Sequence, residues 1–239
     1  MEHGFIREVQ LRRETVDDFG KYPFNIPAVE KLDRLRFDPR VTFLIGENGS
    51  GKSTLIEAIA ILLGLNPEGG SQNFSFAERP SESDLHEHLR PVRSERRPRR
   101  QFFLRAESLF NVATQVEALK LSDYGWEELH ERSHGEAFLW IMTDRFVGGG
   151  LYILDEPEAA LSPKRQLSML TRMDELVREG SQLIIATHSP ILMAYPNATI
   201  YELDQSGIHE VDYEDTEHYQ ITRDFLQQRG SFLRHLLKT

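Results

Sequence analysis

The residues best suited to chemistry form the octet GENGSGKS at positions 46–53. It fits the pattern G-x-x-x-x-G-K-[ST], in which glycines let backbone N–H groups converge on a phosphate. Lys52 adds a positive charge, the Ser53 hydroxyl can bind Mg²⁺, and a following helix adds a favourable dipole. The alternative is an ordinary glycine-rich turn, but a chance match has odds of about one in a hundred. We expect nine nucleotide-binding residues here: Gly46, Glu47, Asn48, Gly49, Ser50, Gly51, Lys52, Ser53 and Thr54.

Two neighbouring acids, Asp155 and Glu156, directly follow the apolar run Leu151–Leu154. A strand of the same parallel sheet would end beside the phosphate-binding loop. There Asp155 can hold Mg²⁺ and Glu156 can act as general base toward the attacking water. Alternatively, the two acids simply begin the next helix.

The pattern of apolar runs predicts the elements that position these residues. Buried strands alternate with amphipathic helices, which indicates an α/β fold with a mostly parallel sheet flanked by helices. The expected strands are 5–11, 41–45, 102–104, 151–154 and 183–186, with a hairpin over 199–211. The expected helices are 53–63, 108–120, 135–146, 163–178 and 217–228.

Composition narrows the class of protein. The chain has 239 residues, no cysteine and a formal charge of −10. Disulfides, thiolate metal sites and cysteine nucleophiles are therefore excluded. No apolar run approaches the ~18 residues of a membrane helix, and the first residues do not resemble a signal peptide, so we expect a cytoplasmic protein. The acidic total predicts poor general affinity for nucleic acid.

The charge is unevenly distributed, because Arg90–Arg105 contains seven arginines and one glutamate. We expect a single domain over 1–239 with an insertion at about 66–134. In it, 66–100 is predicted to be a polar, arginine-rich loop, and 108–134 a helical part with a signature segment. The arginines are either a solvated loop or a contact surface for nucleic acid or a separate partner protein.

The order of four motifs resembles the ABC-type ATPase superfamily. After the phosphate-binding loop (Walker A) come SHGE at 133–136, LDEPEAALS at 154–162 and ATHSP at 186–190. Within the superfamily, the chain looks like the short stand-alone ATPases grouped near RecF and SMC-like heads. The resemblance implies a P-loop NTPase fold, with ATP and Mg²⁺ as cofactors. It also implies hydrolysis of ATP to ADP and phosphate, and a head-to-tail homodimer around two ATP molecules.

The resemblance also implies roles for individual residues. Ser133 and Gly135 match the signature segment, which reaches the γ-phosphate of the opposite subunit. His188 matches the switch histidine that contacts the γ-phosphate, and the loop 159–162 crosses the dimer interface. His134 departs from the usual signature glycine, and the Ser133-x-x-Glu136 spacing is also that of a capping box.

Two positions of the family pattern have no clear match. No glutamine follows the strand at 102–104 as the Q-loop requires, although Glu107 offers an oxygen ligand there. Tyr22 and Phe24 are the candidates for stacking on adenine.

The expected function is Mg²⁺-dependent ATP binding and hydrolysis that closes and opens a homodimer, coupled to nucleic-acid maintenance or defence. The alternatives are the soluble ATP-binding subunit of an ABC transporter and an ATP-gated regulatory binding module.

Overall fold

A six-stranded, mostly parallel sheet forms the centre of the computed structural model, which describes residues 4–66, 83–107 and 133–237. The strand order is β5-β6-β7-β3-β8-β9, and only β9 runs antiparallel to its neighbour. The strands are β3 (Val41–Ile45), β5 (Gln101–Arg105), β6 (Leu151–Asp155), β7 (Gln182–Ala186), β8 (Thr199–Asp204) and β9 (Gly207–Glu210). The predicted α/β fold class is therefore confirmed.

Successive residues of the central strands pack into two different hydrophobic cores. In β6, Tyr152 and Leu154 belong to one core, whereas Leu151 and Ile153 belong to the other. Side chains alternate across a strand, so a strand covered on both faces buries the side chains at every position. This explains why the central strands are mostly apolar, and why the polar exceptions Thr42 and Gln182 are hydrogen-bonded.

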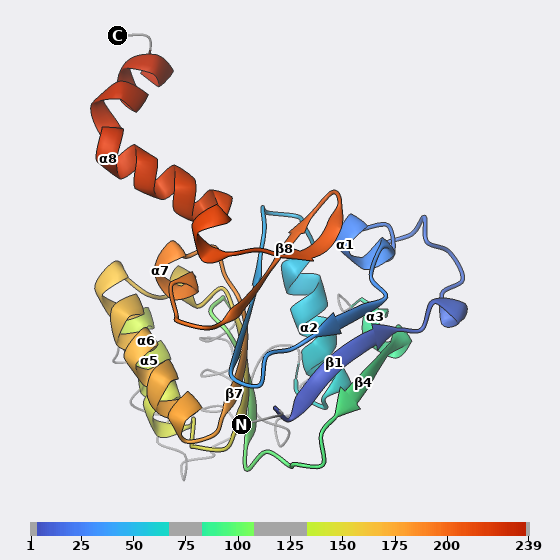
Figure 1. Ribbon diagram of the computed structural model, residues 1–239. Helices are drawn as coiled ribbons and strands as arrows, with labels where there is room; N and C mark the ends of the chain where they lie inside the picture. Colours follow the sequence, from blue (N-terminus) through green and yellow to red (C-terminus); the bar gives the residue numbers. More distant parts are fainter. Residues whose placement is uncertain (1–3, 67–82, 108–132, 238–239) are drawn as a thin grey trace.

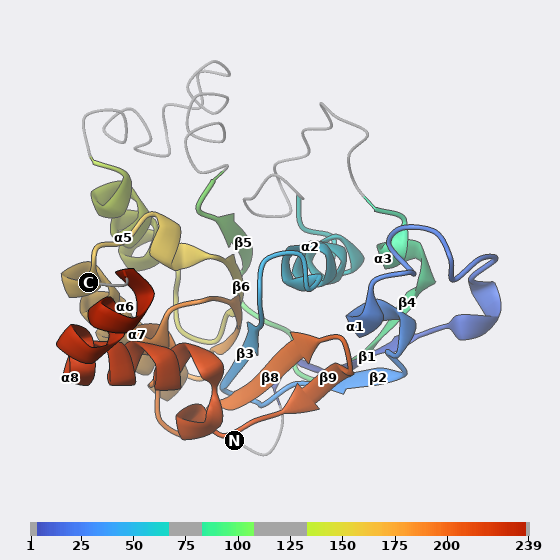
Figure 2. The same ribbon diagram turned by 90° about the horizontal axis from the view of Figure 1, so that it is seen from above.

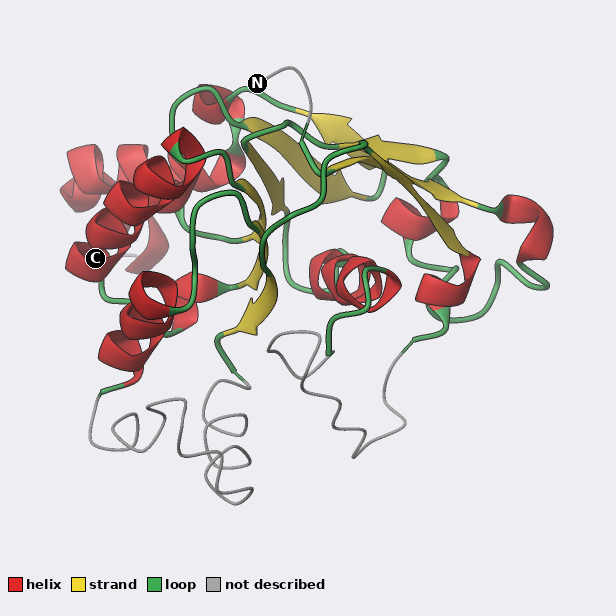
Figure 3. Ribbon diagram, turned by 90° about the horizontal axis from the view of Figure 1, so that it is seen from below, coloured by secondary structure: helices red, strands yellow, loops and turns green. Residues whose placement is uncertain are grey.

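Helices cover each face of this sheet. α5 (His134–Asp144), α6 (Pro163–Arg178) and α7 (Pro190–Met193) lie on one face, and α2 (Lys52–Leu62) lies on the other (Figure 2). α6 begins with proline at its first position and is followed by Gly180 at φ 86°. Proline at the start and glycine just after the end are the usual residues that begin and terminate a helix. Figure 3 shows the sheet between the two groups of helices.

A second sheet, antiparallel and three-stranded, packs beyond α2. Its order is β2-β1-β4, with β1 (Ile6–Leu11), β2 (Arg34–Arg36) and β4 (Leu89–Arg93). The short helices α1 (Pro27–Glu30), α3 (Leu85–His88) and η1 (Arg13–Thr15) lie around it. The predicted loop over 66–100 is therefore wrong from Leu85 to Arg93. Pairing with β1 makes a strand of a segment whose arginines and proline suggested a loop.

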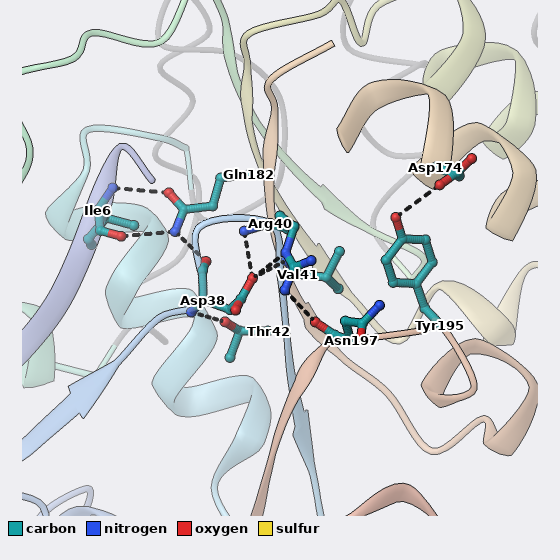
Figure 4. Close-up of polar contacts among 9 residues, drawn as sticks. All are labelled: Ile6, Asp38, Arg40, Val41, Thr42, Asp174, Gln182, Tyr195 and Asn197. Atoms are coloured by element: carbon teal, nitrogen blue, oxygen red, sulfur yellow. Dashed lines mark hydrogen bonds and ion pairs between the residues drawn. The ribbon is translucent and has the colours of Figure 1, made fainter. Parts of the chain in front are cut away.

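Gln182 joins the two sheets (Figure 4). Its side-chain oxygen accepts hydrogen bonds from the backbone N–H groups of Phe5 and Ile6, at 2.8 and 3.0 Å. Its side-chain nitrogen donates to the carbonyls of Ile6 and Asp38, both at 2.9 Å. Gln182 is fully buried, and a buried amide without hydrogen bonds would destabilise the folded protein. These four hydrogen bonds satisfy it.

The remaining predicted elements within the described residues agree with the structure within a few residues, except at the end of the chain. α8 runs from Glu217 to Leu237, well past the predicted end at 228, with a kink at Gln228. It has no buried residue and projects from the body (Figure 1). The short turns η4 (Pro157–Ala159) and η5 (Tyr213–Asp215) complete the description.

The predicted helix 108–120 lies outside the described residues. None of the helices in the described part of the chain combines the length and the hydropathy that a membrane span requires.

Candidate functional site

The octet 46–53 forms the loop between β3 and α2, with three glycines in left-handed backbone conformations. Gly46, Gly49 and Gly51 have φ values of 140°, 82° and 99°. A Cβ atom on Gly46 would lie 2.3 Å from the carbonyl oxygen of Leu203, and one on Gly51 would lie 2.7 Å from Ile26. Both glycines are therefore required by conformation and by space.

Lys52 is almost fully buried at the first position of α2. Its ammonium group donates hydrogen bonds to the carbonyls of Gly46 and Glu47, at 2.9 and 3.0 Å. Burial lowers the pKa of Lys52, while the nearby carboxylates oppose that shift. The Ser50 hydroxyl is also buried and has no hydrogen-bond partner among the described residues. A buried cation and an unpaired hydroxyl beside a helix N-terminus suit the oxygens of a bound phosphate.

Asp155 ends β6 beside the start of α2. Its Oδ1 accepts a hydrogen bond from the Ser53 hydroxyl at 3.3 Å. Burial raises the pKa of Asp155 to about 6, with Arg105 acting in the opposite direction. The paired oxygens of Asp155 and Ser53 are the hard donors that Mg²⁺ prefers, so these residues fit the ion.

Glu156 adopts the left-handed conformation, with φ 46° and ψ 53°. A residue other than glycine is strained there, and such strain often occurs at functional sites. His188 Nε2 lies 3.4 Å from Glu156 Oε1. Burial, followed by the charge of Lys52, lowers the pKa of His188, which favours the neutral ring. The general-base candidate and the switch-histidine candidate are thus brought together.

Two residues that sequence reasoning missed contact His188. Glu158 accepts hydrogen bonds from the Thr187 hydroxyl at 2.7 Å and from the His188 backbone N–H at 2.5 Å. His218, near the start of α8, lies 3.2 Å from His188 between ring nitrogens. Glu158 belongs to the motif quoted above, whereas no local pattern marks His218.

Of the two adenine candidates, only Tyr22 lies exposed beside the loop. Its hydroxyl is 3.3 Å from the Thr54 hydroxyl, and the residue is 63% exposed. Phe24 is buried against Phe19 and His88. A cavity of about 260 Å³ also borders the loop, and Glu202, Asp204 and Glu217 are among the residues that line it. These acids disfavour a polyphosphate in that cavity, so Tyr22 stays the better candidate for contact with the nucleotide.

The segment predicted to be the signature begins α5. Ser133 is its N-cap, and a capping box with Glu136 is present. Arg165 donates to the Ser133 hydroxyl at 3.1 Å and to Glu136 Oε1 at 2.8 Å. A Cβ atom on Gly135 would lie 2.8 Å from the carbonyl of Ala160. The capping alternative is therefore present in the geometry, and no described hydrogen bond joins Ser133 to the phosphate-binding loop.

At the end of β5, Arg105 rather than Glu107 contacts the candidate metal ligand. Arg105 Nε lies 3.2 Å from Asp155 Oδ2, and Arg105 Nη1 lies 2.9 Å from Glu57 Oε2. Glu107 is exposed. The strand pairing could have revealed this contact, because neighbouring parallel strands end at the same edge of a sheet.

The other arginines of the segment 90–105 are arranged differently. Arg90 lies in β4 and donates to Gln10 at 2.6 Å. Five arginines from the end of β4 to the start of β5 are exposed: Arg93, Arg96, Arg97, Arg99 and Arg100. We call these five the arginine surface. They lie at the amino edge of the parallel sheet, where the Arg99 N–H donates to Gly149 and the Arg100 carbonyl accepts from Leu151. Three of them border a cavity of about 180 Å³.

Comparison with known proteins gives two family matches. A model described as "AAA domain" matches residues 15–125, and one described as "AAA domain, putative AbiEii toxin, Type IV TA system" matches residues 137–194.

The curated relatives belong to two groups. An ABC transporter ATP-binding protein of Haemophilus influenzae is 29% identical over 188 residues, which are 70% of each chain. The DNA repair protein RAD50 of Drosophila melanogaster is 33% identical over 91 residues, 38% of this chain and only 6% of RAD50.

Among solved structures, cbiO1 of Clostridium perfringens, part of the transporter complex cbiONQ, shares the fold. Its TM-score is 0.50 at 16% identity, over 99% of this chain and all of that one. In sequence, the chain is homologous to the ATP-binding proteins of ABC transporters and, over a shorter stretch, to RAD50, and its matches are to ATPase domains of the AAA/ABC type.

Proposed function

We propose that this protein hydrolyses ATP to ADP and phosphate in the cytoplasm and closes as a head-to-tail homodimer around two MgATP molecules. The observation that carries the proposal is the set of groups at the carboxyl edge of the sheet. A buried lysine, a loop of convergent backbone N–H groups and two consecutive acids meet there. Phosphate binding, metal binding and water activation need these groups together.

Each residue has a definite role in this proposal. The loop amides and Lys52 hold the phosphates, and Tyr22 stacks on the adenine. Asp155 and Ser53 hold Mg²⁺, which supplies charge neutralisation at the phosphate oxygens when bound.

A second group of residues acts on the attacking water and on the γ-phosphate. Glu156 accepts the proton of the attacking water, and His188 contacts the γ-phosphate from the other side. Ser133 and Gly135 offer the N-terminus of α5 to the γ-phosphate of the second subunit. Hydrolysis breaks this bridge between the subunits and opens the dimer.

Replacing Glu156 with glutamine tests this cycle. The Glu156→Gln variant keeps the shape of the side chain but cannot accept the proton, so ATP persists and holds the dimer closed. With saturating MgATP, light scattering after size-exclusion chromatography should give twice the 27.6 kDa of one chain. Glu210→Gln, an exposed change on β9, is the matched control. A Glu156→Gln protein that stays monomeric contradicts the proposed dimer.

We propose nucleic acid as the partner of the cycle, bound by the arginine surface. Five exposed arginines with one neighbouring acid, Glu95, form a local positive patch on an acidic protein. The similarity to RAD50, a DNA repair protein by its name, supports this choice.

The second candidate is an ATP-binding subunit of an ABC transporter, favoured by the relatives with the broadest coverage. ATPase activity that nucleic acid stimulates, and that salt suppresses, favours the first candidate. Stimulation by a membrane protein encoded beside this one favours the second. ATP binding with negligible turnover would instead indicate a regulatory module.

A further inference from the structure

Arg105 lies where it can neutralise the proposed Mg²⁺ site in the absence of the ion. It is the last residue of β5 and pairs in register with Asp155, the last residue of β6. Its guanidinium group bridges two carboxylates, Asp155 at 3.2 Å and Glu57 at 2.9 Å. The Asp155 side chain is 3% exposed, so its charge requires a partner in the folded protein.

The two oxygens of Asp155 are both engaged. Oδ1 accepts from the Ser53 hydroxyl, and Oδ2 faces Arg105. A divalent cation held by Asp155 and Ser53 needs lone pairs of both side chains, so the Ser53 hydroxyl must turn its hydrogen away. The cation would also lie beside the Arg105 guanidinium group, and two positive charges on one buried carboxylate repel each other. Arg105 and the metal therefore compete for Asp155.

Glu57 gives Arg105 a second carboxylate partner. Glu57 lies four residues after Ser53 on α2, so the two side chains share one face of the helix. Its side chain is 17% exposed and already contacts Arg105. Arg105 can release Asp155 and keep this ion pair, which limits the cost of the exchange.

We propose that Arg105 is a resident counter-ion of the metal site, which occupies Asp155 until the metal arrives with ATP. This inference rests on the proposed function, because it takes Ser53 and Asp155 as the ligands of Mg²⁺. Without nucleotide, Arg105 keeps the affinity for divalent cations low. With nucleotide, the phosphate oxygens add ligands, and the metal displaces Arg105 toward Glu57. Arg105 is thus a positioning residue that makes metal binding depend on nucleotide.

The test measures Mn²⁺ binding to the nucleotide-free protein by electron paramagnetic resonance of the free ion. Arg105→Met keeps the length of the side chain and removes its charge. We expect the variant to bind Mn²⁺ more tightly than wild type, with a dissociation constant lower by about ten-fold or more. The double variant Arg105→Met/Asp155→Asn should lose this gain. Arg178→Met, in the exposed pair with Asp174, is the matched control and should bind Mn²⁺ as wild type does.

A second variant keeps the test decisive where Arg105→Met does not fold. Glu57→Gln removes the second partner, so Arg105 stays on Asp155. Mn²⁺ binding in the presence of ATP should then weaken several-fold, while metal-free ATP binding stays unchanged. Unaltered Mn²⁺ affinity in folded Arg105→Met, or in Glu57→Gln where Arg105→Met does not fold, overturns the proposal.

Asp155→Asn separates this inference from the proposed function. If Asp155→Asn leaves binding of Mn²⁺ with ATP unchanged, the metal site itself is wrongly assigned. If that binding requires Asp155 while the charge of Arg105 has no effect, only the role of Arg105 fails.

Discussion

The two edges of the parallel sheet carry opposite charge, one strand length apart. At the carboxyl edge, Asp155, Glu156 and Glu158 lie around Lys52, which is buried. At the amino edge, the arginine surface is exposed, and the segment 93–100 that carries it contains one acid, Glu95. The separation is about 16 Å, given five residues in β5 and about 3.3 Å per residue.

If the proposed function holds, one protein binds phosphate in two physically distinct ways at these two edges. The carboxyl edge offers fixed backbone donors and a buried ammonium group, so its binding depends on geometry and is shielded from salt. The amino edge offers guanidinium groups in water, so the nucleic-acid binding proposed there should depend on counterion release and weaken with salt. The net charge of −10 predicts neither of these two modes of phosphate binding.

The largest effect is expected at the carboxyl edge. Lys52→Ala removes the buried cation of the loop, and we expect nucleotide affinity to fall by roughly a hundred-fold or more. A fluorescence titration with a labelled ATP analogue measures this loss. Lys164→Ala, an exposed lysine on α6, should bind as wild type does. Equal nucleotide affinity in Lys52→Ala and wild type would contradict the assignment of the loop.

A smaller and salt-dependent effect is expected at the amino edge. The triple variant Arg93→Ser, Arg97→Ser and Arg99→Ser should weaken single-stranded DNA binding by about ten-fold at low salt. The slope of log affinity against log salt should become shallower by about 0.7 for each phosphate that the variant no longer neutralises. Fluorescence anisotropy at several salt concentrations measures both quantities.

Nucleotide affinity in this triple variant should not change, because the arginine surface and the phosphate-binding loop lie at opposite edges of the sheet. Arg178→Ser on α6 serves as the control. An unchanged salt slope would move the nucleic-acid site elsewhere or remove it from the proposal.

The smallest effect is on stability and concerns Asp155. Its pKa is raised from 3.8 to about 6 in the folded chain, so the folded state binds this proton more tightly than the unfolded state. The stability that this group contributes is present at low pH and is lost as pH rises through that interval. Asp155→Asn removes this loss, so at pH 7.5 the nucleotide-free variant should melt a few degrees higher than wild type.

Thermal unfolding across pH 5 to 8 measures the effect. The excess stability of Asp155→Asn over wild type should shrink as pH falls below about 6. Asp174→Asn, in an exposed ion pair, should show no such trend. A variant less stable than wild type at pH 7.5 would show that the pairing with Arg105 outweighs the cost of burial.

The parallel sheet could be predicted because its central strands are largely apolar runs, such as Leu151–Leu154 and Leu183–Ala186. The antiparallel sheet could not. β2 has only one buried residue, Leu35, and β4 contains arginines and a proline. Both become strands through pairing with β1, a long-range interaction that local pattern does not contain.

The candidate site likewise has one part that local sequence predicts and another that depends on long-range contacts. The phosphate-binding loop and the pair Asp155–Glu156 are local motifs, so their placement at one edge followed from their spacing. Arg105 was grouped with the arginine run because it follows Arg100 by only five residues. Its partners come from other elements: strand register places it opposite Asp155, and the packing of α2 places Glu57 beside it.

α8 is expected to unfold less cooperatively than the central sheet. None of its 21 residues is buried, and its tertiary contacts include those near its start, of His218 with His188 and of Tyr219 with Tyr213. The kink at Gln228 divides it into two segments, each short enough to be marginal as an isolated helix in water. Its amide hydrogens should therefore exchange through local fraying, whereas those of β3 and β7 exchange only when the whole domain opens. His218 lies in the first turn of α8 and contacts His188, so we expect the order of the proposed γ-phosphate pocket to depend on the first turn of a helix whose remainder frays independently.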